Sequence, residues 1–239
     1  MRRFIGSPDP ADPSVLILPA EEARHAARVV RLAAGEMITV ICGGSEYECR
    51  IEQISPSMAR ARIVRELPRS ARGVRITLAQ GMAKGGKMDD IVRMACEMGV
   101  EAFIPLFCGR AAMGGKVVEI WPKLARWKAI AVSAAKVSGG APCAVLEPMD
   151  MPGLAAFQYS GLKLALWEEE SGSLKSVLSA PPRPENVMIV AGPEGGFSAE
   201  EMAALRAGGF ATVSLGHRIL RTQTAGVVAS AAVLYHFGD

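Results

Sequence analysis

The segment from Gly192 to Glu201, GPEGGFSAEE, combines a glycine-rich turn with a polar start to a new element. It follows the apolar run NVMIVA, which is typical of a buried strand. Gly192, Gly195 and Gly196 permit a sharply turned backbone and the close approach of a ligand. A glycine loop at a strand end is where open α/β sheets bind ligands. Taken alone, the loop is explained equally well as an ordinary tight turn.

A helix is expected directly after this loop. Ser198 and Glu201 have the spacing of a capping box, so the helix should begin at Ala199. Gly208-Gly209 supplies the residues that commonly end a helix. The loop is therefore predicted to lie between a strand and a helix.

A second glycine-ended strand, ATVSLG, leads into the short segment HRILR. Gly216 ends the strand, and the apolar pair Ile219-Leu220 stands between two arginines. Such a pair could line an adenine pocket, with backbone groups reading the edge of the base. In isolation, a loop whose apolar side chains fill the core is the simpler interpretation.

Residues 222–237, TQTAGVVASAAVLYHF, predict a thin helix that begins at Thr222 or Thr224 as N-cap. Its many small side chains let another backbone approach closely. Two interpretations stay open, a helix buried against the sheet and a helix packed in a dimer interface.

These segments lie in a stretch where strands and helices alternate. From residue 74 the pattern is strand, loop, helix, repeated, which predicts an α/β domain with a mostly parallel sheet. The expected helices are 88–98, 117–137 and the two described above, and the expected strands are 74–80, 100–106, 163–167, 186–192 and 211–216.

The first 72 residues have a different character, with eleven arginines and no lysine. Residues 47–52 and 58–63 alternate apolar and charged side chains with the period of half-buried strands. Gly43-Gly44 predicts a hairpin turn, and one helix is expected from Glu21 to Leu32. We therefore predict a β-rich domain over 1–72, a linker around Pro68–Gly73 and an α/β domain over 73–239.

The composition excludes several classes of protein. Half of the 239 residues are hydrophobic and 21% are charged, which is ordinary for a globular protein, and the net charge of +3 favours an anionic partner only weakly. No apolar run is long enough to span a membrane, and the N-terminus lacks the apolar region of a signal peptide. Five scattered cysteines without a C-x-x-C pair predict neither a metal site nor a disulfide framework, and they favour a reducing cytoplasm.

The two C-terminal motifs together, GPEGGFSAEE and LGHRILRTQTA, resemble the SPOUT class of methyltransferases. More narrowly, the chain resembles the bacterial 16S rRNA uridine-N3 methyltransferase family. The opening MRRF, the run EEARHAARVVRLAAGE and the segment 78–106 extend the similarity over nearly the whole chain.

The resemblance implies a PUA-like β-barrel that helps to hold RNA, followed by a trefoil-knotted α/β domain. It implies S-adenosyl-L-methionine as cofactor, cradled by Gly192–Gly196 and Leu215–Leu220, and methylation of N3 of a uridine in the 16S rRNA of the small ribosomal subunit. It also implies a homodimer through the C-terminal domain. The cofactor-binding residues expected on this basis are Leu166, Gly192, Glu194, Gly195, Gly196, Leu215, Gly216, Ile219, Leu220 and Thr222.

Two residues are candidates for the chemistry. Uridine N3 carries a proton at neutral pH, so the site must help to remove it or stabilise the anion. The guanidinium of Arg221 could stabilise that anion or orient a phosphate. Glu194, the only acid of the GPEGG loop, is either a base or a carboxylate that stabilises the loop, and we favour the second role.

Basic residues provide candidates for RNA contact, through phosphates rather than bases. They are Arg2, Arg3, Arg28, Arg31, Lys84, Lys87 and Arg110. Each of them taken alone is more simply explained as a solvated surface charge.

The sequence departs from the family pattern at three places. Gln223 stands where the family usually has glutamate, and His217 replaces a common proline. In Ser133–Gly140 a customary Glu-Gln pair and an arginine are absent. These departures leave open an RNA-binding protein on an altered scaffold, or an enzyme with another RNA target.

A rival enzyme class is suggested by GMAKGGK at 81–87, which has the spacing of a phosphate-binding loop. The match fails at Met88, where a serine or threonine should reach Mg²⁺. A nucleotide hydrolase is therefore the weaker interpretation.

Overall fold

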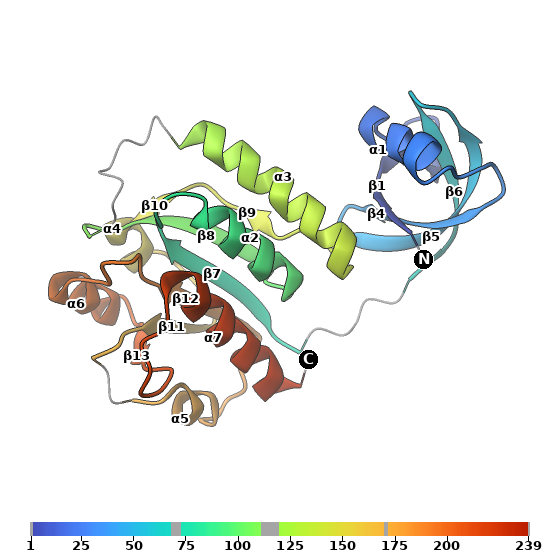
Figure 1. Cartoon of the computed structure of the whole chain (residues 1–239). Helices are drawn as coiled ribbons and strands as arrows, with labels where there is room; N and C mark the ends of the chain where they lie inside the picture. Colours follow the sequence, from blue (N-terminus) through green and yellow to red (C-terminus); the bar gives the residue numbers. More distant parts are fainter. Residues whose placement is uncertain (1, 68–72, 111–119, 170–171, 239) are drawn as a thin grey trace. The chain divides into compact units, whose positions relative to one another are not determined.

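The computed structural model describes residues 2–67, 73–110, 120–169 and 172–238. The chain divides into two compact units (Figure 1). Residues 1–71 and 135–142 form the N-terminal unit, and residues 72–134 and 143–239 form the C-terminal unit. Of the linker expected at Pro68–Gly73, residues 68–72 lie outside the described part of the chain.

The N-terminal unit is a near-closed barrel of six strands in the order β1-β4-β5-β6-β3-β2. All neighbours are antiparallel except β1 and β4, which pair in parallel. The strands are β1 (Arg3–Ile5), β2 (Ser7–Asp9), β3 (Asp12–Leu18), β4 (Met37–Cys42), β5 (Ser45–Ile54) and β6 (Ala59–Glu66).

The predicted alternation on β5 and β6 is confirmed. Cys49, Ile51, Ala59 and Ala61 are buried in the barrel core, whereas the charged residues between them are exposed or half-buried. The hairpin at Gly43-Gly44 is also confirmed, and both glycines have positive φ, as the tight turn between β4 and β5 requires.

The helix predicted from Glu21 to Leu32 is wrong in its length and type. The chain forms α1 (Ala20–Arg24) and then a π-helical turn, η1 (His25–Val29), in which the Val30 N–H donates to the His25 carbonyl. This wider turn lets Ala26 and Leu32 both enter the core. Arg31 leaves the turn with φ 59°, a left-handed conformation that is uncommon for arginine.

The C-terminal unit contains one fully parallel sheet in the order β10-β8-β7-β12-β11-β13, with β9 paired to β8. This confirms the predicted α/β architecture. The strands are β7 (Arg75–Gly81), β8 (Ala102–Phe107), β9 (Ala144–Val145), β10 (Met149–Asp150), β11 (Leu162–Leu166), β12 (Asn186–Ala191) and β13 (Ala211–Val213).

Helices cover both faces of this sheet. α2 and α7 pack on each other, and α7 also contacts β7 and β12 (Figure 1). α4 packs on α6, and both contribute to a core cluster with β8, β11 and β12. The helices are α2 (Lys87–Glu97), α3 (Trp121–Ser138), α4 (Met151–Ala155), α5 (Leu174–Leu178), α6 (Ala199–Ala207) and α7 (Thr222–Phe237).

Most predicted boundaries hold to within a few residues. α6 begins at Ala199 with the expected Ser198/Glu201 capping box. α3 begins at Trp121 rather than residue 117, and residues 117–119 lie outside the described part. β13 ends at Val213, earlier than predicted. The trefoil knot stays a prediction, because strand order and pairing do not define how a chain is threaded.

Candidate functional site

A pocket of about 1040 Å³ lies at the carboxyl ends of β11, β12 and β13 and at the start of α7, all within the C-terminal unit. This is the edge at which parallel sheets bind ligands. Nearly all of the residues predicted to hold the cofactor line it, namely Leu166, Gly192, Glu194, Gly196, Leu215, Gly216, Ile219, Leu220 and Thr222. The two motifs read from the sequence therefore meet at one site.

The glycine loop is closely packed where it borders the pocket. Gly196 has φ +66°, and a Cβ atom there would lie 3.1 Å from Oε1 of Glu168. A Cβ on Gly192 would approach the Cα of Gly196 and the Phe197 ring to 3.4 Å. Side chains at these positions would crowd the loop itself and the neighbouring Glu168 and Phe197. Gly195 is not among the lining residues, and it faces the backbone of Arg110 instead, where a Cβ would meet the carbonyl oxygen at 3.0 Å.

Glu194 is held by the loop that precedes α2. Its Oε1 accepts hydrogen bonds from the Lys84 backbone N–H at 3.0 Å and from Nζ of Lys87 at 2.7 Å. Partial burial raises the pKa of Glu194, but the bonds from Lys87 and from backbone N–H groups outweigh it, so the pKa lies below its ordinary value. A carboxylate with a lowered pKa is a poor proton acceptor. These contacts support the predicted stabilising role rather than the role of a base.

The start of α7 differs from the expectation. Arg221 is the N-cap, and no side chain caps the helix. Thr222 is the first helical residue, and its hydroxyl donates to the Gly192 carbonyl at 2.7 Å instead of capping the helix. The N-cap prediction for Thr222 or Thr224 is therefore wrong, because this hydroxyl bridges to the glycine loop.

Arg221 lines the pocket and is exposed, and among the described residues its guanidinium has no hydrogen-bond or ion-pair partner. The side chain of Ile219 is 84% exposed, whereas Leu220 is half-buried. The apolar pair is thus directed to the pocket and solvent and does not fill the core. A free guanidinium beside an apolar rim can meet an anionic or polarised group on a ligand.

Several pocket residues were not identified from the sequence. The list is Trp167, Glu168, Ser173, Pro193, Phe197, Val213, Ser214, Arg218 and Ala225, while His217 and Gln223 were noted only as departures from a pattern. Glu168 had a usable signal, since it follows β11 at the same edge of the sheet as the two motifs. Among the described residues its carboxylate has no hydrogen-bond or ion-pair partner, unlike that of Glu194.

The basic residues predicted to contact RNA are placed differently from one another. Lys87 lines the pocket and pairs with Glu194, and Nη1 of Arg110 donates to the Phe197 carbonyl at 3.2 Å. Lys84 has an exposed side chain. In the N-terminal unit Arg2 donates to the Val30 carbonyl and Arg3 pairs with Glu46, while Arg28 and Arg31 lie on and just after η1. Four of the seven residues thus belong to the N-terminal unit and three to the C-terminal unit.

The described residues contain no group of three or more histidine, cysteine or acidic residues able to hold a metal ion. None of the described helices is long and apolar enough to cross a membrane. In the loop that resembles a phosphate-binding loop, Met88 is buried. The Lys84 backbone N–H there is bound to Glu194, so it does not face an open phosphate site.

Comparison with known proteins identifies the class of protein to which this chain belongs. Residues 70–234 match the family model of an RNA methyltransferase domain, and residues 18–64 match that of an RNA methyltransferase PUA domain. The chain thus belongs to the RNA methyltransferases that join a PUA domain to a parallel-sheet domain.

Sequence relatives and a solved structure then identify the family within this class. The chain is 30% identical to the ribosomal RNA small subunit methyltransferase E of Bacillus subtilis (90% of this chain, 88% of the relative) and 33% identical to that of Aquifex aeolicus (94% and 95%). A crystal structure of the Neisseria gonorrhoeae protein of that name, bound to S-adenosyl methionine, superposes with a TM-score of 0.86 at 28% identity, covering 98% of this chain and 97% of the other. The chain belongs to the ribosomal RNA small subunit methyltransferase E family.

Proposed function

We propose that this chain transfers the methyl group of S-adenosylmethionine to N3 of a uridine in the 16S rRNA of the small ribosomal subunit. The observation that carries the proposal is the pocket where both C-terminal motifs meet, in a chain whose fold matches that of a relative bound to this cofactor. The size of the pocket suits a ligand of this class.

The lining residues fit the cofactor chemically. Leu166, Leu215 and Leu220 provide apolar contact for an adenine ring, and the loop at Gly192–Gly196 lets backbone groups approach the ligand. The free carboxylate of Glu168 suits the ribose hydroxyls or the cationic end of the molecule. Bound there, the cofactor supplies an electrophilic methyl carbon on a sulfonium.

Arg221 is proposed to act on the base. In the transfer the N3–C bond forms, the S–C bond breaks, the sulfonium becomes a neutral thioether and the N3 proton leaves to an acceptor. Negative charge develops on the uracil ring as N3 loses its proton. In this proposal the guanidinium of Arg221, which lines the pocket, stabilises that charge. Lys87 also lines the pocket, where it pairs with Glu194.

RNA contact in the N-terminal unit is proposed at α1 and η1. Three arginines of β6 are engaged by acids, Arg60 with Asp9, Arg62 with Asp12 and Glu52, and Arg65 with Glu48. Among the described residues, the Arg24, Arg28 and Arg31 guanidiniums have no ion-pair partner. Free cations neutralise phosphates more effectively than paired ones.

The backbone conformation of this segment also supports the proposal that it contacts RNA. A π-helical turn and a left-handed arginine occur together at His25–Arg31. Both features are uncommon, and both are found disproportionately at functional sites.

A homodimer through α7 is part of the proposal. Val228 is 41% exposed and Tyr235 is 88% exposed, and their spacing of seven places them on one face of the helix. A partner subunit would bury this apolar face. Within the described part of the chain the five cysteines form no disulfide bond, which suits a reducing cytoplasm.

The test is a titration of the purified chain with S-adenosylmethionine, followed by mass spectrometry of small ribosomal subunits incubated with both. We expect about one cofactor per chain and a methyl group on uridine N3. Binding without methylation of these subunits would point to another RNA target, and RNA binding without cofactor binding would favour a non-enzymatic scaffold.

Arg221→Ala tests the role of the guanidinium, with Arg221→Lys as the matched control that keeps the charge. We expect Arg221→Ala to lower kcat by about 10²–10³-fold, as the loss of one charge-stabilising donor does, with little change in cofactor affinity. Full turnover by Arg221→Ala would remove this residue from the mechanism.

A further inference from the structure

Gln80, near the end of β7, is a polar side chain in a fully buried position. Its exposed fraction is 0%, and its neighbours along the strand, Leu78 and Ala79, are buried apolar residues. A buried carboxamide is costly unless it is hydrogen-bonded. Its partners therefore indicate what the side chain is for.

The carboxamide nitrogen lies between two segments that border the pocket. Nε2 of Gln80 donates to Oγ1 of Thr222 at 3.0 Å and lies 3.2 Å from the Gly192 carbonyl oxygen. The Thr222 hydroxyl in turn donates to the same carbonyl at 2.7 Å. These three groups form a closed triangle that joins β7, the glycine loop and the first turn of α7.

The orientation of the carboxamide is set by its surroundings. Nε2 also lies 3.2 Å from the Gly81 carbonyl oxygen, so every polar partner on that side is an oxygen. A reversed carboxamide would place Oε1 against two carbonyl oxygens. Oε1 instead faces Gly226 of α7, where a Cβ atom would lie 3.2 Å from it.

The backbones around the triangle are too close to shift freely. A Cβ on Gly81 would lie 2.5 Å from the Pro193 nitrogen, and a Cβ on Gly226 would lie 2.9 Å from Cδ1 of Leu78. The end of β7 is thus packed against the glycine loop on one side and α7 on the other.

We propose that Gln80 and Thr222 are positioning residues that form a buried clamp, which fixes the distance between the glycine loop and the start of α7. Gly192 lines the pocket, and Thr222 directly follows Arg221, so the clamp places Arg221 relative to the bound cofactor. The inference rests on the proposed function, since the cofactor is the ligand that the loop holds.

The test uses Thr222→Val, which keeps the shape of the side chain and removes the hydroxyl. Thr222→Ser keeps the hydroxyl and loses only the methyl group. Gln80→Met removes the carboxamide from the other end of the clamp. The matched control is Ser230→Ala, because Ser230 is also buried on α7 and donates to the Gly226 carbonyl at 2.8 Å, but does not line the pocket.

Three quantities are measured for each variant: the melting temperature, the Kd for S-adenosylmethionine and the hydrogen exchange of the amides in residues 192–196 without ligand. We expect Thr222→Val and Gln80→Met to raise the Kd by about tenfold, the size expected for one or two buried hydrogen bonds, and to speed exchange in the loop. Thr222→Ser should stay near the wild type, and Ser230→Ala should lower only the melting temperature.

Two results would overturn the clamp while leaving the proposed function intact. The first is that the wild type binds the cofactor, but neither Thr222→Val nor Gln80→Met changes the Kd or the rate of hydrogen exchange in the loop. The other is a Ser230→Ala protein that loses affinity as much as Thr222→Val does, which would make the effect one of general stability. A wild type that does not bind S-adenosylmethionine would overturn the proposed function, and the clamp with it.

Discussion

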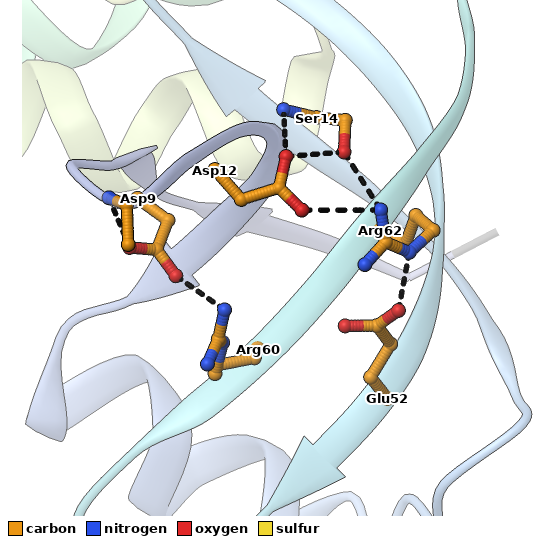
Figure 2. A network of polar contacts seen from close by, with 7 residues as sticks. Asp9, Asp12, Ser14, Glu52, Arg60 and Arg62 are labelled. Atoms are coloured by element: carbon orange, nitrogen blue, oxygen red, sulfur yellow. Dashed lines mark hydrogen bonds and ion pairs between the residues drawn. The ribbon is translucent and has the colours of Figure 1, made fainter.

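The two units of this protein each contain a polar network, and the networks differ in charge and in depth. In the N-terminal unit Arg62 bridges Asp12 and Glu52, and Figure 2 shows this charged group on the barrel strands. The three side chains are 47%, 37% and 34% exposed. In the C-terminal unit Gln80 and Thr222 are uncharged and buried. The charged network is therefore partly open to solvent, and the uncharged one is enclosed.

This contrast in burial predicts where the loss of a polar contact has the larger effect. Exposed ion pairs contribute about 0–1 kcal/mol because water and salt screen them. A buried polar group must keep its partners, since losing one leaves the other without water or protein to bind. We therefore expect the barrel network to tolerate change and the network beside the pocket to tolerate little.

The charged network also changes how the arginines are interpreted. The richness of residues 1–72 in arginine is a property of the sequence, but the pairs on β6 show that part of this charge is neutralised. Asp9 is the most deeply placed of the acids, 8% exposed, and Figure 2 shows it directed at Arg60. A count of basic residues therefore overstates the RNA-binding surface.

Of the changes that compare the two networks, adding one methyl group beside the buried network should cost the most stability. In Gly226→Ala the new Cβ would meet Cδ1 of Leu78 at 2.9 Å and Oε1 of Gln80 at 3.2 Å. Overpacking of this kind costs about 1–3 kcal/mol. Chemical denaturation should show the lost stability, and calorimetry should show weaker cofactor binding. The control is Gly86→Ala, because a Cβ there meets nothing within 4 Å and φ is −78°, which an alanine adopts without strain. Equal losses in the two variants would contradict the argument from packing.

A smaller effect should separate free arginines from paired ones. Arg28→Ala removes a charge from η1, and Arg62→Ala removes one that acids already neutralise. If Arg28 contacts a phosphate, the slope of log K against log salt for RNA binding should fall by about 0.7–0.9. Arg62→Ala should leave the slope unchanged. The same slope for both variants would show that the paired and unpaired arginines do not differ in RNA contact.

The smallest effect concerns the ion pair that borders the pocket. Because the pKa of Glu194 is lowered in the folded chain, the carboxylate adds stability above its unfolded pKa, and this stability is lost as the pH falls through the folded pKa. The difference in melting temperature between wild type and Glu194→Gln should be steady from neutrality to about pH 5 and shrink at more acid pH. At its full size it should correspond to at most about 1 kcal/mol, since the pair is partly exposed. A difference that grows with acid would contradict the lowered pKa.

The architecture was largely predictable, because it depends on local periodicity. Alternation at 47–52 predicted β5, and the capping box at Ser198 predicted the start of α6 within one residue. The π-helical turn at His25–Val29 was not predictable, because it depends on which side chains the barrel core admits. The short helices α4 and α5 contain only five residues each, too few to show a helical period.

The pocket was predicted through its two motifs, but the contacts that organise it were not. In the sequence, Gln80 is a single polar residue within an apolar strand. Its partners Gly192 and Thr222 lie 112 and 142 residues further along the chain. No local pattern contains such a pairing. The place of Glu168 in the pocket was not predicted either, although this residue follows the end of β11 at the same edge of the sheet as the ends of β12 and β13.

The order of the strands has a consequence for how the molecule is made. β7 pairs with β12, so the centre of the sheet joins residues 75–80 to residues 186–191. Such distant pairings close late, because a long loop must lose its entropy before any contact forms. Thr222 completes the pocket from the first turn of the final helix. On a translating ribosome the strands of the barrel, within residues 3–66, are therefore available to pair before the pocket can form, because the pocket needs residues as far along as Ala225.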